Sequence, residues 1–118
     1  HAAFHTPDGA AGHARRLELT STSLSGTDRA TGRGQHTVEL AFPLAPGIQV
    51  HPSPDARSAA LTLPDGPTLR FHVDEGPPLE VEEGRVALDF NREVPAPVLV
   101  VRVRAPLPLT LRWRLDLA

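Results

Sequence analysis

Histidine is the residue type in this sequence with the clearest capacity for metal chemistry. The 118 residues contain six histidines: His1, His5, His13, His36, His51 and His72. Neutral imidazoles bind zinc or copper when two or three converge on the ion, often together with a carboxylate. Asp8 and Asp28 are available as that oxygen ligand. The N-terminal spacing matches no specific zinc signature, so surface histidines near a chain end are the simpler interpretation.

The first residue offers a second kind of metal site. If His1 is the mature N-terminus, its amino group and ring nitrogen would chelate copper, and a second histidine would complete the site. This predicts an exported copper- or zinc-binding protein as one alternative. The aromatic axial ligand of copper oxygenases is not evident, and the sequence has no tyrosine. Copper affinity that disappears when one residue is added before His1 would single out this alternative.

Nucleophilic and acid–base chemistry find little support. Ser21, Ser23 and Ser25 lie outside any G-x-S-x-G turn. Glu82 and Glu83 are adjacent in a predicted strand, so their carboxylates point to opposite faces and cannot act as a glycosidase pair. Cysteine, lysine and tyrosine are absent, which excludes disulfides, zinc–thiolate sites, Schiff bases and phenolic acids. We therefore expect no complete active site in this chain alone.

Arginine is the residue type best suited to binding an anion. Four arginines lie on the polar faces of the last two predicted strands: Arg102, Arg104, Arg112 and Arg114. If those strands pair, the guanidinium groups form a stripe able to bind a polyanion or a carboxylated sugar. The alternative is a solvated face that pairs with an acidic block, whose members are Asp74, Glu75, Glu80, Glu82 and Glu83. The net charge of −2 favours neither nucleic acid nor an anionic membrane as partner.

Apolar residues recur with a period of two in many segments of the sequence, which is typical of β-strands. We therefore expect strands to position the histidines, carboxylates and arginines named above. The clearest alternation contains Leu107, Leu109, Leu111, Trp113, Leu115 and Leu117, with Trp113 expected in the core. Residues 59–63 and 69–73 flank a Pro-Asp-Gly-Pro turn and predict a β-hairpin. Residues 98–104 begin apolar on both faces and predict a central strand.

The pattern as a whole predicts an all-β fold, an antiparallel β-sandwich of about ten short strands without substantial helix. We expect the sandwich over residues 15–118 and an irregular segment over residues 1–14, with no run of the roughly 20 apolar residues that a membrane span needs. Because the sequence lacks an initial methionine, we expect a processed chain or a piece of a longer protein.

Several short patterns occur in an order typical of one enzyme family. They are His13-x-Arg15-Arg16-Leu17, Leu24-Ser25-Gly26-Thr27-Asp28-Arg29, Gly32-x-Gly34-x-His36-x-Val38-Glu39-Leu40, Phe42-Pro43-Leu44-Ala45-Pro46-Gly47, Leu79-Glu80-Val81-Glu82-Glu83-Gly84, Pro97-Val98-Leu99-Val100 and Leu107-Pro108-Leu109-Thr110-Leu111-Arg112-Trp113. In this order they resemble the last part of the β-sandwich domain of heparinase II/III-like polysaccharide lyases, over residues 13–118.

The resemblance implies an α/α-toroid domain before the sandwich and an acidic, uronic-acid-containing polysaccharide as substrate. Such enzymes cleave by β-elimination: a base removes the C5 proton beside a neutralised carboxylate, and an acid protonates the leaving oxygen. In the family, His and Tyr of the toroid do most of this, and the sandwich can hold a metal. The resemblance implies His13, and next His36, as ligands of a divalent metal such as zinc. His13 is equally a structural ligand on this basis, and His36 a capped strand-end residue.

Three hypotheses follow. The first is a C-terminal sandwich that supports the toroid of a periplasmic or secreted lyase, lines its cleft with arginines and is inactive alone. The second is a stand-alone carbohydrate- or protein-binding module, and the third is the metal-binding protein that uses His1. Sheet surface that a toroid would cover also allows a homodimer. The mass of the native gene product separates the first hypothesis from the others.

Overall fold

The computed structural model describes residues 3–5, 12–89 and 92–117 of the chain. The regular structure in these ranges consists of strands: β1 (Ala3–His5), β2 (Gly12–Leu19), β3 (Ser23–Thr31), β4 (Gln35–Pro43), β5 (Gln49–Pro52), β6 (Ser58–Thr62), β7 (Thr68–Glu75), β8 (Glu80–Asp89), β9 (Arg92–Pro106) and β10 (Leu109–Leu117). Over the same ranges the structure holds no helix with the length and apolarity to cross a bilayer.

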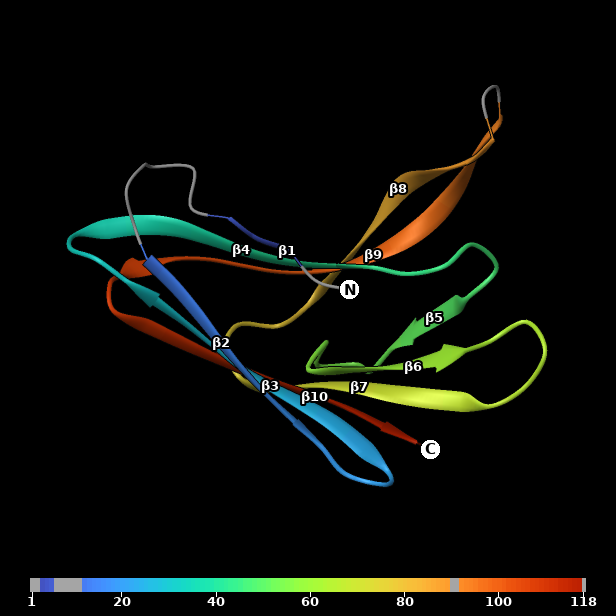
Figure 1. Cartoon of the computed structure of the whole chain (residues 1–118), viewed down its shortest axis with the longest axis horizontal. Coiled ribbons are helices and arrows are strands. Elements are labelled where there is room, and N and C mark those ends of the chain that lie inside the picture. Colours follow the sequence, from blue (N-terminus) through green and yellow to red (C-terminus); the bar gives the residue numbers. More distant parts are fainter. Residues whose placement is uncertain (1–2, 6–11, 90–91, 118) are drawn as a thin grey trace.

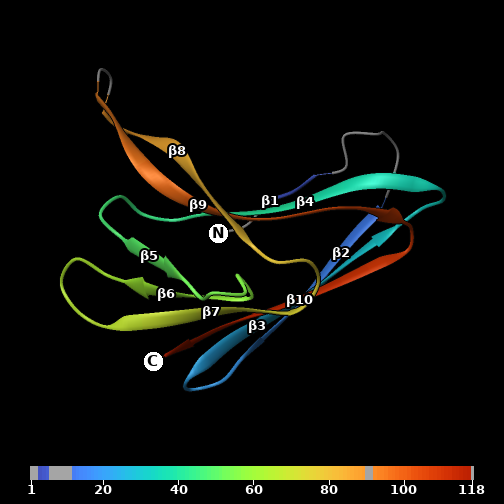
Figure 2. The same ribbon diagram turned by 180° about the vertical axis from the view of Figure 1, so that it is seen from behind.

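The strands form two facing antiparallel sheets (Figure 1). One sheet has four strands in the order β1-β4-β9-β8, and the other has six in the order β2-β3-β10-β7-β6-β5. The β8–β9 hairpin projects beyond the layered part, away from β5, β6 and β7 (Figures 1 and 2). The predicted all-β antiparallel sandwich is confirmed.

The core lies between the two sheets and follows from the period-two alternation. Val38, Leu40 and Phe42 of β4 face Leu111 and Trp113 of β10, and all five are buried. The rings of Phe42 and Trp113 lie 4.9 Å apart between centroids at an interplanar angle of 70°, a favourable edge-to-face contact. The predicted core position of Trp113 is therefore confirmed.

Two local predictions are also confirmed. Strands β6 and β7 form the expected hairpin, in which Thr62 is paired with Thr68 across the turn. Strand β9 pairs with β4 on one side and β8 on the other, as a central strand should. Three consecutive residues of β9, Leu99, Val100 and Val101, are buried. Because neighbouring residues of a strand point to opposite faces, this segment is apolar on both faces.

The N-terminal segment differs from its prediction. Residues 3–5 form β1, in which Phe4 is the register partner of Leu40, and β2 already begins at Gly12. Alanine, glycine and histidine have weak strand preferences, so the pairing here is decided by the neighbouring strands β4 and β3 rather than by local pattern. Asp8 and the copper ligand predicted at His1 lie outside the described residues.

Candidate functional site

The four predicted arginines occupy two different sheets. Arg102 and Arg104 lie on β9 of the four-stranded sheet, and Arg112 and Arg114 lie on β10 of the six-stranded sheet. The stripe expected from pairing of these strands is therefore wrong. Neighbouring strands pair in most connections, but here the chain crosses from one sheet to the other between residues 106 and 109.

Arg102 pairs with carboxylates of its own sheet. Its Nε donates to Glu39 Oε2 on β4 at 2.8 Å, and Nη2 and Nη1 reach Glu82 at 3.1 Å and Glu80 at 3.4 Å on β8. Hydrogen bonds to Glu39 and Glu82 raise the pKa of Arg102 above its ordinary value. Glu80 and Glu82 of the acidic block, together with Glu39, thus pair with this arginine, as the alternative interpretation expects. Arg104 extends its Nη1 toward Thr37 Oγ1, at 3.4 Å.

A polar groove of about 280 Å³ lies on the outer face of the six-stranded sheet. We call it the outer-face groove; its lining residues are Arg16, Glu18, Ser25, Gly26, Thr27, Asp74, Arg112, Trp113 and Arg114. The strand register arranges the polar side chains in rows across β2, β3 and β10. Arg16, Thr27 and Arg112 form one row, and the next contains Glu18, Ser25 and Arg114.

The arginines of the outer-face groove are only loosely neutralised. Arg112 Nε lies 3.0 Å from Glu75 Oε1, and both side chains are 55% exposed. Arg114 Nη2 lies 3.6 Å from Asp74 Oδ1, and its Nε lies 3.3 Å from Asp116 Oδ2. Exposed pairs of this kind contribute at most about 1 kcal/mol, so an anionic ligand can displace the carboxylates.

Arg16 adds a third guanidinium to the groove. It is exposed, and it forms no ion pair with any residue that the structure describes. In one row Thr27 lies between Arg16 of β2 and Arg112 of β10, and in the next Ser25 lies between Glu18 of β2 and Arg114 of β10. Guanidinium groups beside hydroxyls are suited to a ligand that carries both carboxylates and hydroxyl groups, as an acidic sugar does.

A buried carboxylate holds the three strands of the groove together from beneath. Asp28 of β3 points into the sandwich, where its side chain is fully buried. Its Oδ1 accepts hydrogen bonds from Arg15 Nε at 2.6 Å and His13 Nε2 at 2.7 Å, both on β2. Its Oδ2 accepts one from Trp113 Nε1 of β10 at 2.8 Å. Asp28 therefore joins both neighbours of β3 through side chains.

Two opposing effects set the pKa of Asp28. Burial raises the pKa because it removes the carboxylate from water, whereas the hydrogen bonds from Arg15, His13 and Trp113 lower it. The donors prevail, and the pKa of Asp28 falls below its ordinary value of 3.8. Asp28 is consequently ionised at neutral pH, and its two carboxylate oxygens accept the hydrogen bonds of these three donors. It is a structural anion rather than a general base.

Gly26 makes room for the tryptophan in this network. A Cβ atom at residue 26 would lie 2.3 Å from Cε2 and Cζ2 of Trp113. Only glycine therefore lets the indole lie flat enough against β3 for its N–H to reach Asp28.

The two predicted metal ligands lie in different sheets with different contacts. His13 on β2 bonds to Asp28, and His36 on β4 places its Nε2 2.7 Å from the backbone oxygen of Arg33. In the described part of the chain, no three residues among His, Cys, Asp and Glu gather as a metal site would require. The structure does not bring His13 and His36 together, and zinc binding by either of them stays a prediction.

Sequence reasoning missed Arg16 and the central role of Asp28. His13 falls in the segment predicted to be irregular, so the face that His13 and Arg15 share on β2, from which both side chains reach Asp28, could not be predicted. Arg16 carried no signal either. Its place beside Thr27 and Arg112 depends on which strands flank β3, and strand order is not a local property of the sequence.

Comparisons with known proteins agree with this architecture. The family model described as "Heparinase II/III-like, C-terminal" matches residues 1–114. The crystal structure of heparan sulfate lyase HepC from Pedobacter heparinus superposes with a TM-score of 0.77 over 98% of this chain and 20% of that chain, at 18% identity. A mutant of the same lyase gives a TM-score of 0.77 over 98% and 19%, at 17% identity.

These solved structures show the likeness of fold, and this chain spans about a fifth of their length. None of the curated proteins compared with the chain matches it. The family match covers almost the whole sequence, and the fold shared with the HepC chains agrees with it. The chain therefore belongs to the heparinase II/III-like, C-terminal family.

Proposed function

We propose that this chain is the β-sandwich domain of a lyase that cleaves uronic-acid-containing polysaccharides, and that it binds the acidic chain in the outer-face groove. The observation that carries the proposal is the set of three arginines, Arg16, Arg112 and Arg114, around the hydroxyls of adjacent strands. Membership of the heparinase II/III-like family and the fold shared with a heparan sulfate lyase support it.

The spacing of the groove arginines favours a polymer over a single small anion. Arg112 and Arg114 are two residues apart on one strand, which separates their positions by roughly 7 Å. Arg16 lies two strands away from Arg112, at roughly 10 Å. An extended polysaccharide with several carboxylates engages such a grid at more than one point, and a monosaccharide does not.

The proposal assigns binding and charge neutralisation, but not proton transfer, to this domain. In β-elimination the carboxylate beside C5 must be neutralised before the C5 proton can leave. A guanidinium of the groove would supply that neutralisation. The base and the acid would come from an α/α-toroid domain that precedes this chain in the longer lyase. Arg102 is not part of the proposal because three carboxylates already surround it.

Titration calorimetry with heparan sulfate tests the proposal. We expect the chain to bind it more tightly than neutral dextran, with an affinity that decreases as salt increases. Arg112→Gln should weaken binding by about 10- to 150-fold, because a charge-assisted hydrogen bond contributes roughly 1.5–3 kcal/mol. The triple variant Arg16→Gln, Arg112→Gln, Arg114→Gln should abolish measurable binding.

Arg85→Gln is the matched control, since Arg85 is an exposed arginine on β8 of the other sheet. It should bind heparan sulfate like the unmodified chain, and circular dichroism should show the same fold for every variant. Full affinity in the triple variant, or an equal loss in the Arg85 control, would contradict the assignment of the groove.

A further inference from the structure

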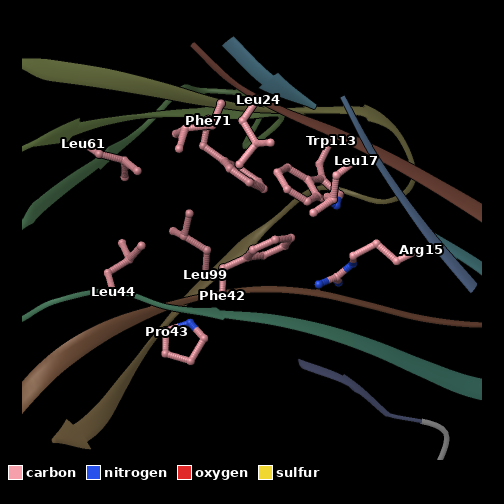
Figure 3. Close-up of a pocket in the computed structure, with 11 residues that line it drawn as sticks. Arg15, Leu17, Leu24, Phe42, Pro43, Leu44, Leu61, Phe71, Leu99 and Trp113 are labelled. Carbon is pink, nitrogen blue, oxygen red and sulfur yellow. The ribbon is translucent and has the colours of Figure 1, made fainter. Parts of the chain in front are cut away.

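A cavity of about 260 Å³ lies between the two sheets. Its wall is mainly apolar and comes from both layers: Phe42 and Leu99 from the four-stranded sheet, and Leu61 and Phe71 from the six-stranded sheet (Figure 3). The cavity is open to solvent beside Leu17, whose side chain is exposed. An apolar cavity that opens at the surface can receive an apolar side chain of an occupant from outside the chain.

Arg15 brings one polar group to this apolar cavity. Its Nε is bound to Asp28, and its guanidinium end points inward toward the ring of Phe42 (Figure 3). Its Nη2 is buried and has no hydrogen-bond partner within residues 3–5, 12–89 and 92–117. A buried donor without an acceptor costs roughly 1–3 kcal/mol. The occupant is therefore expected to present an oxygen to Nη2.

Exposed leucines continue the apolar wall outward from the cavity. Leu17, which lines the cavity, is 55% exposed, and Leu19 on the same face of β2 is 79% exposed. A second hollow, of about 240 Å³, is lined by Leu19 and Leu117 and shares Leu24 and Leu115 with the cavity. The apolar surface thus runs from the interior to the rim of the sandwich.

The strand that carries these leucines is an edge. β2 is the outermost strand of the six-stranded sheet, and β3 is its one partner among the described strands. An edge strand presents unpaired N–H and C=O groups, and an added extended segment can pair with them. Such a segment places alternate side chains on the inner face, beside Leu17 and Leu19 and at the mouth of the cavity.

We propose that β2 and the cavity form a docking site for an extended apolar segment of the domain that precedes this chain in the longer lyase. The backbone of the segment pairs with β2, one of its apolar side chains enters the cavity, and an oxygen of the segment accepts a hydrogen bond from Arg15 Nη2. A small apolar ligand would fill the cavity but leave Leu19 in water, whereas a segment paired with β2 covers both.

The solved relatives supply the reason to place the segment in the same polypeptide. This chain corresponds to about a fifth of the HepC chains, so about four fifths of such a protein lies outside the matched part and is available to pack against it. The inference rests on the proposed function, because it requires the longer lyase.

Hydrogen–deuterium exchange of the full-length gene product and of the 118-residue chain tests the inference. Peptides that cover β2 should exchange at least tenfold more slowly in the full-length product, because the added segment protects the outer amides of the edge. The double variant Leu17→Ser, Leu19→Ser should bring exchange back to within threefold of the isolated chain. Arg15→Lys keeps a positive charge beside Asp28 but lacks Nη2. In the full-length product this variant should make the β2 peptides exchange several-fold faster than in the unmodified protein.

Val81→Ser is the matched control: Val81 is an apolar residue 42% exposed on β8, outside the docking site. It should leave the protection of β2 unchanged. Equal exchange of β2 in the two proteins overturns the inference. Protection of the isolated chain that disappears on dilution overturns it too, since the occupant is then a second copy. A gene product that contains no further domain refutes the proposed function itself, whereas an unprotected β2 in an active lyase refutes only the docking site.

Discussion

Asp28 carries its charge inside the sandwich, where three donors replace the water that burial removes. The donors come from both strands that flank β3, so the carboxylate acts as a crosslink between β2 and β10 as well as an acceptor. Loss of one member of a buried charged network leaves the other members without partners, which costs more than the pair itself contributes. The stability of this domain should therefore depend on the ionisation of a single residue.

The free energy of unfolding should fall steeply in acid because of Asp28. Its pKa in the folded chain lies below the ordinary value of 3.8, which the carboxyl has in the unfolded chain. A lowered folded pKa contributes stability that is fully present above the unfolded value and is lost as the pH falls through the folded pKa. We expect constant stability from pH 7 to about pH 5 and a decrease below about pH 4, measured by urea unfolding followed by circular dichroism.

Asp28→Asn separates this contribution from other carboxylates. The variant should be less stable at pH 7 by about 2–4 kcal/mol, and its stability should change less between pH 5 and pH 3. Asp55, whose pKa is lowered chiefly by the Ser53 hydroxyl, is present in both proteins and cancels in the difference. Asp65→Asn, at an exposed turn, is the control and should match the unmodified chain. If the free energy of unfolding fell equally with pH in the Asp28 variant and in the unmodified chain, the Asp28 network would be excluded as the cause of the acid sensitivity.

Gly26 provides a second residue-scale prediction. Gly26→Ala would press a methyl group into the indole of Trp113, and neither the ring nor the strand can move far in a packed core. We expect a loss of about 1–3 kcal/mol in the free energy of unfolding. Gly66→Ala is the control, because a Cβ there meets nothing within 4 Å, and it should change stability by less than about 0.5 kcal/mol. Equal stability of the two variants would show that the Trp113 indole can shift to accommodate the added methyl group.

At the scale of elements, β9 is joined to both of its neighbours by the Arg102 side chain. The guanidinium contacts a carboxylate of β4 and two carboxylates of β8, so one side chain spans three strands. Such exposed ion pairs are screened by salt. Arg102 therefore stabilises the outer face of the four-stranded sheet mainly at low ionic strength.

Arg102→Met keeps most of the aliphatic stem and removes the charge. We expect the thermal midpoint to fall by about 2–5 °C in dilute buffer and by less than half of that in 1 M NaCl. Differential scanning calorimetry at the two salt concentrations measures the effect, with Arg85→Gln on β8 as the control. A decrease of the same size at both concentrations would assign the effect to lost packing instead of charge.

At the scale of the whole molecule, the sequence predicted the strands better than their order. Alternation is local, so β10 could be identified from Leu109, Leu111 and Trp113 alone, and β9 from its consecutive apolar residues. Which sheet each strand joins depends on contacts between distant segments. The predicted stripe of Arg102 and Arg112 failed for that reason, because consecutive strands entered opposite layers.

In the candidate site, too, local patterns predicted some residues, whereas strand order placed others. Arg112 and Arg114 were predicted from residue type and from their polar face. Arg16 was not, because it reaches the groove only through the register of β2 on β3 and of β3 on β10. The family resemblance supplied the domain and its enzyme class, which no pattern of alternation contains.

The position of Trp113 gives the molecule a built-in optical probe. Trp113 is the only tryptophan and the sequence has no tyrosine, so the near-ultraviolet emission of the folded chain comes from one indole. That indole donates its N–H to Asp28 and also lines the inter-sheet cavity. Intrinsic fluorescence should consequently register both the protonation of the carboxylate and the arrival of an apolar group in the cavity, without any label attached to the chain.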